Sequence, residues 1–293
     1  SLTQAASYVS LSPMFSVDTS LWSFEALLPT PVDNLIWAYY SFMPRHARYL
    51  LPPYNRTAMV VDGTEIITFD GAVLRAPPSS CKLLLAQYKS DSLIMQSQQA
   101  AAASSHFILK VSGITVEVKP DFTVTMNGQP ISGPQQIQGE VKVYKMAEKI
   151  EVMTPTITLR VYKMSHTASV EVSGWTYGQL AGLLGTYDGE MGNDWMTPSG
   201  SRASSLQELV KSWREDQQCQ IPSVSPFSPL HVPIVRMVQC NALFGVRTRC
   251  NPVVRQESFR KMCFTSRNAC HVARAYSALC ATKGVMDVFP LGC

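Results

Sequence analysis

The sequence predicts a mainly β protein, α+β overall, in which an antiparallel β-sandwich precedes a small disulfide-rich helical module. Short segments of alternating apolar and polar residues recur between residues 54 and 174, at roughly ten-residue spacing, as in antiparallel sandwiches. Helix-like apolar periodicity returns after residue 232. Seven of the eight cysteines lie between residues 219 and 293, so the chain joins two differently built regions.

Residues 1–53 are expected to form an N-terminal helical and extended linker. Thr30-Pro31 followed by Asp33 is a helix-start signal, and Pro44 ends the helix. Leu51-Pro52-Pro53 then predicts extended chain. An apolar stripe at helical spacing either packs on the body of the protein or contacts lipid or a partner chain. It comprises Val32, Leu35, Ile36, Tyr39, Tyr40 and Met43.

Residues 54–219 carry the strand pattern of the predicted sandwich. Asp62-Gly63 and Asn127-Gly128 are turn dipeptides typical of hairpins. A low-complexity insertion at residues 98–105 is expected to be a surface loop. Ser204 or Ser205 caps a helix that reaches residue 213. The candidate strands are 58–61, 65–69, 81–87, 93–96, 107–111, 114–118, 122–126, 141–143, 150–152, 157–161 and 170–172.

Residues 220–293 are expected to form a cysteine-rich basic module after a proline-rich boundary near residues 221–232. Helix-like runs lie around 235–244, 255–264 and 273–281. Nine Lys and Arg residues face Glu257 and Asp287, so residues 221–293 carry +7, and the preceding residues carry 4 − 7 = −3. This charge is either a solvated basic surface or a site for a receptor, a sulfated glycan or anionic lipid.

The cysteines predict a secreted protein. Their number is even, no C-x-x-C occurs, and no histidine stands at zinc-finger spacing, which leaves a disulfide framework formed in an oxidising compartment. Asn55-Arg56-Thr57 is an N-glycosylation sequon. The chain starts at Ser1 without a signal peptide, so we expect a processed piece of a longer precursor. The cysteines are Cys81, Cys219, Cys240, Cys250, Cys263, Cys270, Cys280 and Cys293.

Enzymatic, membrane-spanning and nucleic-acid-binding functions are not expected. The chain lacks the motifs of serine hydrolases, zinc proteases, P-loop proteins and dinucleotide enzymes. A metal-dependent enzyme is a further alternative, but the sequence shows no nucleophile–base pair and no open, histidine-rich metal site. No apolar run approaches the roughly 20 residues of a transmembrane helix, and a secreted, disulfide-bearing chain is a poor candidate for binding nucleic acid.

Residues 182–195 form the most informative stretch of the chain. Oxygen-bearing side chains stand at positions 186, 188, 190, 193 and 194 among glycines that allow tight turns. Such oxygens suit a hard cation like Ca²⁺. The stretch is not an EF-hand, because Asn193 and Ser199 occupy the positions that need Gly and Glu. Spacing alone fits a calcium loop and an ordinary Asx-rich turn equally well.

Two motifs more than a hundred residues apart resemble the signatures of a von Willebrand factor type D domain. They are Thr68-Phe69-Asp70-Gly71 and the Gly-Leu-Leu-Gly-Thr-Tyr-Asp-Gly run from residue 182, with Cys81 at a strand start between them. The resemblance covers roughly residues 54–219. It implies a structural Ca²⁺ ion held by Asp70, Thr186, Asp188, the Glu190 carbonyl, Asn193 and Asp194. Thr186 stands where an Asn ligand is usual in that family.

The same resemblance implies a bridge between Cys81 and Cys219, which leaves six cysteines with fifteen possible connectivities. The two cysteines of the family's C-G-L-C element are replaced here by Ala181 and Leu184. Ala58 lies about where their strand partner would be. These replacements argue against disulfide-linked multimers.

A cysteine-poor D domain preceded by residues 41–54 resembles the C-terminal part of large lipid transfer proteins, which include apolipophorins, crustacean discoidal lipoproteins and vitellogenins. The resemblance implies a non-enzymatic, calcium-binding region of a secreted lipid-transport or yolk lipoprotein, cleaved from a larger precursor. Its partners would be the remaining precursor chains and the lipid particle, in haemolymph, plasma or yolk. The alternative is an extracellular clotting, adhesion or gel-forming protein that self-associates through the D domain.

Overall fold

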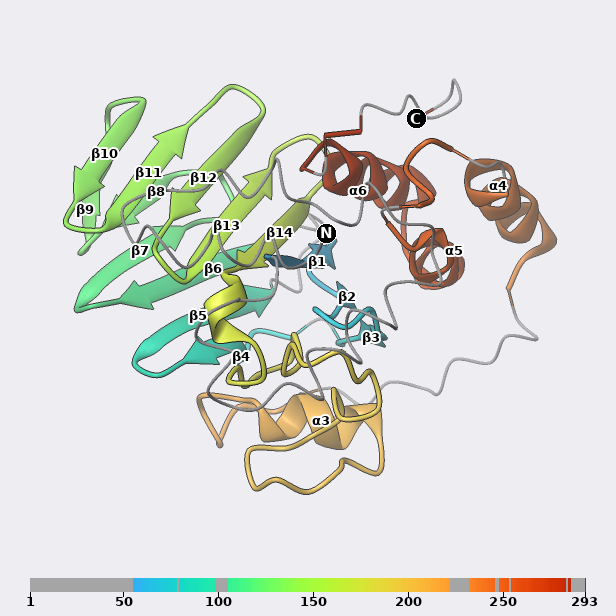
Figure 1. Ribbon diagram of the computed structural model, residues 1–293, viewed down its shortest axis with the longest axis horizontal. Helices are drawn as coiled ribbons and strands as arrows, with labels where there is room; N and C mark the ends of the chain where they lie inside the picture. Colours follow the sequence, from blue (N-terminus) through green and yellow to red (C-terminus); the bar gives the residue numbers. More distant parts are fainter. Residues whose placement is uncertain are drawn as a thin grey trace, which may run out of the picture.

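The computed structural model describes residues 55–77, 79–97, 105–221, 232–245, 248–252, 254–282, 284–285 and 293. In this part of the chain two antiparallel sheets form a sandwich, and the C-terminal helices lie beside it (Figure 1). The predicted β-sandwich followed by a disulfide-rich helical module is therefore confirmed. The expected helix near residues 32–43, the insertion at 98–104 and the proline-rich stretch at 222–231 lie outside the described residues.

The larger sheet has its first strand in its interior. Its order is β10-β11-β12-β13-β14-β1-β2-β3, with β1 paired antiparallel to both β14 and β2. The strands are β1 Arg56–Val61, β2 Glu65–Ile67, β3 Val73–Arg75, β10 Gln135–Gln138, β11 Val141–Lys145, β12 Lys149–Met153, β13 Ile157–Tyr162 and β14 Thr167–Val172.

The smaller sheet is a meander in which consecutive strands are neighbours, in the order β4 to β9. Asn127 and Gly128 have φ of +50° and +79°, as the predicted tight hairpin requires. The expected strand 122–126 is wrong at its start, because Phe122 has φ of +63° and lies in a turn. The strands are β4 Lys82–Tyr88, β5 Asp91–Ser97, β6 Ser105–Val111, β7 Ile114–Val118, β8 Val124–Met126 and β9 Gln129–Pro130.

The helices follow their sequence signals closely. The Ser205 hydroxyl accepts from the Glu208 N–H at 3.2 Å and caps α3, Leu206–Ser212. A 3₁₀ turn, η5, spans Gly174–Thr176. The C-terminal module contains α4 Ile234–Phe244, α5 Gln256–Thr265 and α6 Ala269–Thr282. Helix α6 begins four residues before the expected 273.

All eight cysteines lie among the described residues, and all are paired. Cys81 at the start of β4 bonds to Cys219 after α3, which is the pairing that the family resemblance implies. Closing such a long loop stabilises the fold by about 4–5 kcal/mol in the chain-entropy model. The module carries the other three bridges, Cys240–Cys263, Cys250–Cys280 and Cys270–Cys293.

The central strand β1 is buried on both faces. Ala58 and Val60 point into the sandwich core, whereas Met59 and Val61 join a second core with the C-terminal helices. Ile67 on β2 also belongs to this second core. The helical module therefore completes the outer face of the larger sheet. Its side chains in the second core include Phe259, Met262, Val272 and Tyr276.

Polar contacts frame this second core. His271 Nδ1 lies 2.5 Å from Asp62 Oδ1, and the Ser258 hydroxyl donates to the Gly71 carbonyl at 3.0 Å. Arg274 donates to the Met164 carbonyl at 3.0 Å. The module is thus held at three separate turns of the sandwich.

A buried carboxylate, that of Glu65, also joins the module to the larger sheet. Glu65 is 1% exposed. Its oxygens contact Arg75 Nε at 3.2 Å and accept from the Thr265 hydroxyl at 2.9 Å. Burial raises the pKa of Glu65 from 4.5 to about 7, although Arg75 and Thr265 act in the opposite direction. Ionised Glu65 therefore costs folding free energy near neutral pH.

Substituting Glu65→Gln should flatten the pH dependence of stability. Because the folded-state pKa lies above the unfolded value, Glu65 lends stability below pH 4.5 that is lost as the pH rises through about 7. The wild type should lose roughly 2–3 kcal/mol of unfolding free energy between pH 5 and pH 8 through this group. Denaturant unfolding of both proteins across that range measures the difference.

Glu140→Gln is the matched control, because Glu140 is an exposed acid in the turn between β10 and β11. Its profile should parallel that of the wild type. If the Glu65→Gln profile ran parallel to both, the proposed cost of ionised Glu65 would be wrong.

Candidate metal centre

The Gly-rich loop at residues 182–195 is bound to the sandwich through its backbone. The Leu184 N–H donates to the Leu85 carbonyl of β4 at 2.9 Å, and the Phe69 N–H donates to the Leu184 carbonyl at 2.9 Å. Gly182 has φ of +131°, and a Cβ there would lie 2.4 Å from the Leu85 carbonyl oxygen. Only glycine allows this close approach of the loop to the strand.

Asp70, in the turn between β2 and β3, caps the loop. Its carboxylate accepts from the backbone N–H groups of Asp188 at 3.2 Å and Gly189 at 2.9 Å. Tyr187, just before them, is fully buried with φ of +53°, and its ring packs edge-on against Tyr177. Burial raises the pKa of Asp70 even though these two donors and Arg56 lower it.

Asp194 is the most constrained carboxylate of the site. Its Oδ2 accepts from the Thr68 hydroxyl at 2.5 Å, while its Oδ1 is buried without a hydrogen-bond partner among the described residues. Burial raises the pKa of Asp194 to about 7. Hydrogen bonds from the Thr68 hydroxyl and the Thr186 N–H lower this pKa, whereas the charges of Asp70 and Asp188 raise it further. An unpaired buried oxygen of this kind carries a substantial desolvation cost.

The remaining oxygens form a chain along the loop. The Thr186 hydroxyl donates to Asn193 Oδ1 at 3.1 Å, and Asn193 Nδ2 donates to Asp188 Oδ2 at 2.5 Å. Asp188 Oδ1 accepts from the Glu190 N–H at 2.9 Å. Asp188 is therefore shared between the Asp70 side and the Asn193 side of the loop.

The structure brings all five expected ligand side chains into this corner, namely Asp70, Thr186, Asp188, Asn193 and Asp194. The Glu190 side chain is exposed, and its carbonyl accepts from the Asn193 N–H at 3.3 Å. Thr68 was assigned no role from the sequence. Thr68 lies inside the Thr68–Gly71 motif. Its position as a polar residue at the end of an apolar strand could have indicated a role in the site.

The donor set suits a hard cation better than a soft one. Among the described residues, no three or more His, Cys, Asp or Glu side chains are grouped as a metal site. A cation here would therefore rely on amide, hydroxyl and backbone oxygens besides carboxylates, as Ca²⁺ sites do. Asp194 Oδ1 has no hydrogen-bond partner among the described residues, and the charges of Asp70, Asp188 and Asp194 repel one another. A bound cation would contact the first and offset the second.

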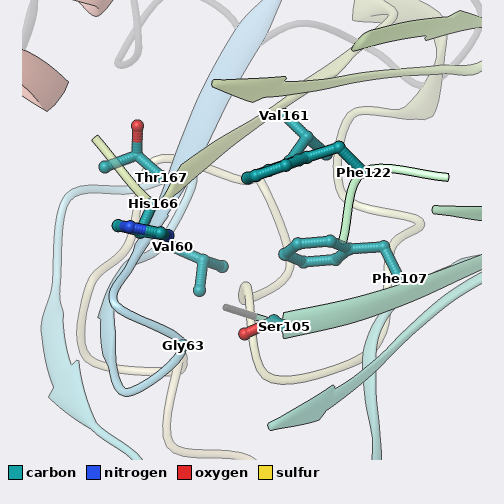
Figure 2. Close-up of a pocket in the computed structure, with 8 residues that line it drawn as sticks. All are labelled: Val60, Gly63, Ser105, Phe107, Phe122, Val161, His166 and Thr167. Atoms are coloured by element: carbon teal, nitrogen blue, oxygen red, sulfur yellow. The ribbon is translucent and has the colours of Figure 1, made fainter. Parts of the chain in front are cut away.

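The cavity in Figure 2 lies elsewhere, between the two sheets. It measures about 10 Å³, which admits one water molecule at most. Its lining is largely apolar, and Ser105 Oγ and His166 Nδ1 find no partner within the described part of the chain. The cavity is too small to hold a lipid chain. It is lined by Val60, Gly63, Ser105, Phe107, Phe122, Val161, His166 and Thr167.

Two further sequence features have clear surroundings. Asn55 is half-buried, with Nδ2 donating to Glu171 and Oδ1 accepting from the Gly174 N–H, each at 3.2 Å. Leu184 is fully buried in the sandwich core, and Ala181 pairs with Gln87 through the backbone. An apolar side chain and a backbone bridge thus stand where the family's C-G-L-C element has cysteines.

Residues 59–201 match the model of the von Willebrand factor type D domain. The whole chain is 45% identical to part of a vitellogenin from Penaeus merguiensis, of which it covers 11%. Apolipophorins from Locusta migratoria are 24% identical over 83% of this chain, which covers 8% of their length. An apolipophorin from Galleria mellonella is 26% identical over 82% of this chain, which covers 17% of its length. The chain thus spans a minor part of each of these relatives.

Substituting Gly185→Ala should displace the Asp194 carboxylate and destabilise the protein. Gly185 has φ of +85°, and a Cβ there would lie 2.0 Å from Asp194 Oδ1. Strain and displacement of the carboxylate should together lower the unfolding free energy by roughly 1–3 kcal/mol. Gly192→Ala is the control, because its Cβ would meet no atom within 4 Å. Denaturant unfolding compares the two, and equal stability of both variants would contradict the close packing described.

Proposed function

We propose that this chain is a calcium-binding region of a secreted lipid-transport or yolk lipoprotein, cleaved from a larger precursor. Residues 59–201 match the von Willebrand factor type D domain, and the whole chain is similar to part of a vitellogenin. The 45% identity over all 293 residues carries the lipoprotein assignment. The apolipophorin relatives support it. Among the described residues, no helix is long and apolar enough to cross a membrane.

Calcium would be a structural ion. Asp70, Asp188 and Asp194 would supply carboxylate oxygens, and Asn193, Thr186 and the Glu190 carbonyl would supply neutral ones. Binding would require the Thr186–Asn193 and Asn193–Asp188 hydrogen bonds to be replaced by contacts with the metal. The ion would offset the repulsion among the carboxylates and fix the loop to the β2–β3 turn.

The region acts by binding rather than by catalysis. Its relatives include a vitellogenin and apolipophorins, and its conspicuous polar cluster consists of carboxylates and amides rather than a nucleophile with a base. Its partners are the rest of the precursor and the lipid particle.

Ca²⁺ should bind the wild type at one site with measurable heat in a calorimetric titration. Asp188→Ala removes a shared carboxylate and should weaken affinity by at least about tenfold. Asp216→Ala, at an exposed acid outside the loop, should bind like the wild type. Absence of binding by the wild type, or unchanged affinity in Asp188→Ala, would refute the calcium site.

The clotting or gel-forming alternative predicts disulfide-linked assemblies. All eight cysteines are paired within the chain, so no thiol remains for bridges between chains. The purified chain should migrate as a monomer on a non-reducing denaturing gel. A ladder that collapses on reduction would favour the alternative.

A further inference from the structure

Helix α4 is apolar on two opposite faces. Cys240, Leu243 and Phe244 are buried against the rest of the module. On the other side, Ile234 and Val235 are 74% and 79% exposed. The helix thus has both a core-facing side and an apolar side in contact with solvent.

The exposed apolar residues form one continuous face. Ile234, Val238 and Ala242 follow each other at four-residue steps, and Val235 lies beside this row. Val238 is 63% exposed, and Ala242 is exposed as well. Contiguous exposed apolar residues of this kind mark sites that contact a protein or a membrane. We call the set Ile234, Val235, Val238 and Ala242 the outer face of α4.

The module that carries this face is strongly basic. Its described charged residues are seven basic ones and Glu257. Arg236 lies on α4 itself and donates to the Arg267 carbonyl at 2.9 Å, which brings a second basic residue next to the helix. The other basic residues are Arg249, Arg255, Arg260, Lys261 and Arg274. An apolar strip on a module with this net positive charge complements a surface that is apolar inside and anionic outside.

The position of α4 leaves this face accessible. The helix lies at the end of the molecule away from the sandwich, with α5 and α6 between them (Figure 1). The Cys240–Cys263 bridge anchors its inner side to α5. The outer face can therefore meet an extended surface while the metal centre, on the sandwich, remains free.

We propose that the outer face of α4 inserts into a phospholipid surface that carries anionic headgroups. Pairing with a second copy would bring two positive modules together, which electrostatic repulsion opposes. The face is aliphatic and lacks the Trp and Tyr that dominate protein–protein hot spots. This inference deepens the lipoprotein assignment, on which its biological meaning rests, by naming the residues that contact lipid.

Flotation of the 293-residue chain with vesicles tests the inference. Phosphatidylcholine vesicles containing phosphatidylglycerol should bind the wild type, and pure phosphatidylcholine should bind it more weakly. The double variant Ile234→Ser/Val238→Ser should lower the partition coefficient by at least about tenfold. Ile137→Ser, at a residue 52% exposed on β10, is the matched control and should bind normally.

Failure of the wild type to float, or equal flotation of the double variant, would overturn the inference. So would a dimer in sedimentation that the double variant abolishes, because the face would then serve self-association. Circular dichroism and calcium titration of the double variant should match the wild type. A negative flotation result with intact calcium binding would therefore remove the lipid surface and leave the calcium proposal standing.

Discussion

The β2–β3 hairpin is the junction on which both halves of the molecule depend. On one side, Asp70 and Thr68 hold the Gly-rich loop through its backbone and through Asp194. On the other, Glu65 and Gly71 receive hydroxyl donors from helix α5. A hairpin of two three-residue strands at a sheet edge has little stability of its own. The Gly-rich loop and the helical module therefore both stabilise the hairpin. A cation bound at Asp70 would restrict the motion of the hairpin further.

Two buried carboxylates, Glu65 and Asp194, make the stability of this junction depend on pH. The pKa values of both Glu65 and Asp194 are raised to about 7 by burial, but their partners differ. Glu65 already has Arg75 and Thr265, whereas one oxygen of Asp194 has no partner among the described residues. The partners of Glu65 are side chains of the protein itself. The unsatisfied oxygen of Asp194 supports the proposal that a cation binds beside it.

Local features of the fold could be predicted from sequence, because they depend on neighbours in the chain. Alternation predicted most of the strands, and Asn127-Gly128 predicted a hairpin. The short strands β3, β9 and β10 were not predicted. The start of α6 was missed because Asn268, whose side chain accepts from the Cys270 N–H, was not recognised as a cap.

Non-local features were not accessible in this way. The unbroken apolar run Ala58–Val61 indicates a strand that is buried on both faces. The alternation of residues along a strand does not indicate which part of the chain covers its second face. The Thr68–Asp194 contact joins residues 126 apart.

Hydrogen exchange measured by mass spectrometry, with Ca²⁺ or with a chelator, tests the central claim most directly. Peptides from the loop at residues 182–195 and from the β2–β3 hairpin should both exchange more slowly with Ca²⁺, because one bound ion would hold both segments in the proposed site. Peptides from β10 and β11, at the far edge of the sheet, should not change. Identical exchange of the loop and hairpin in the two conditions would contradict the account.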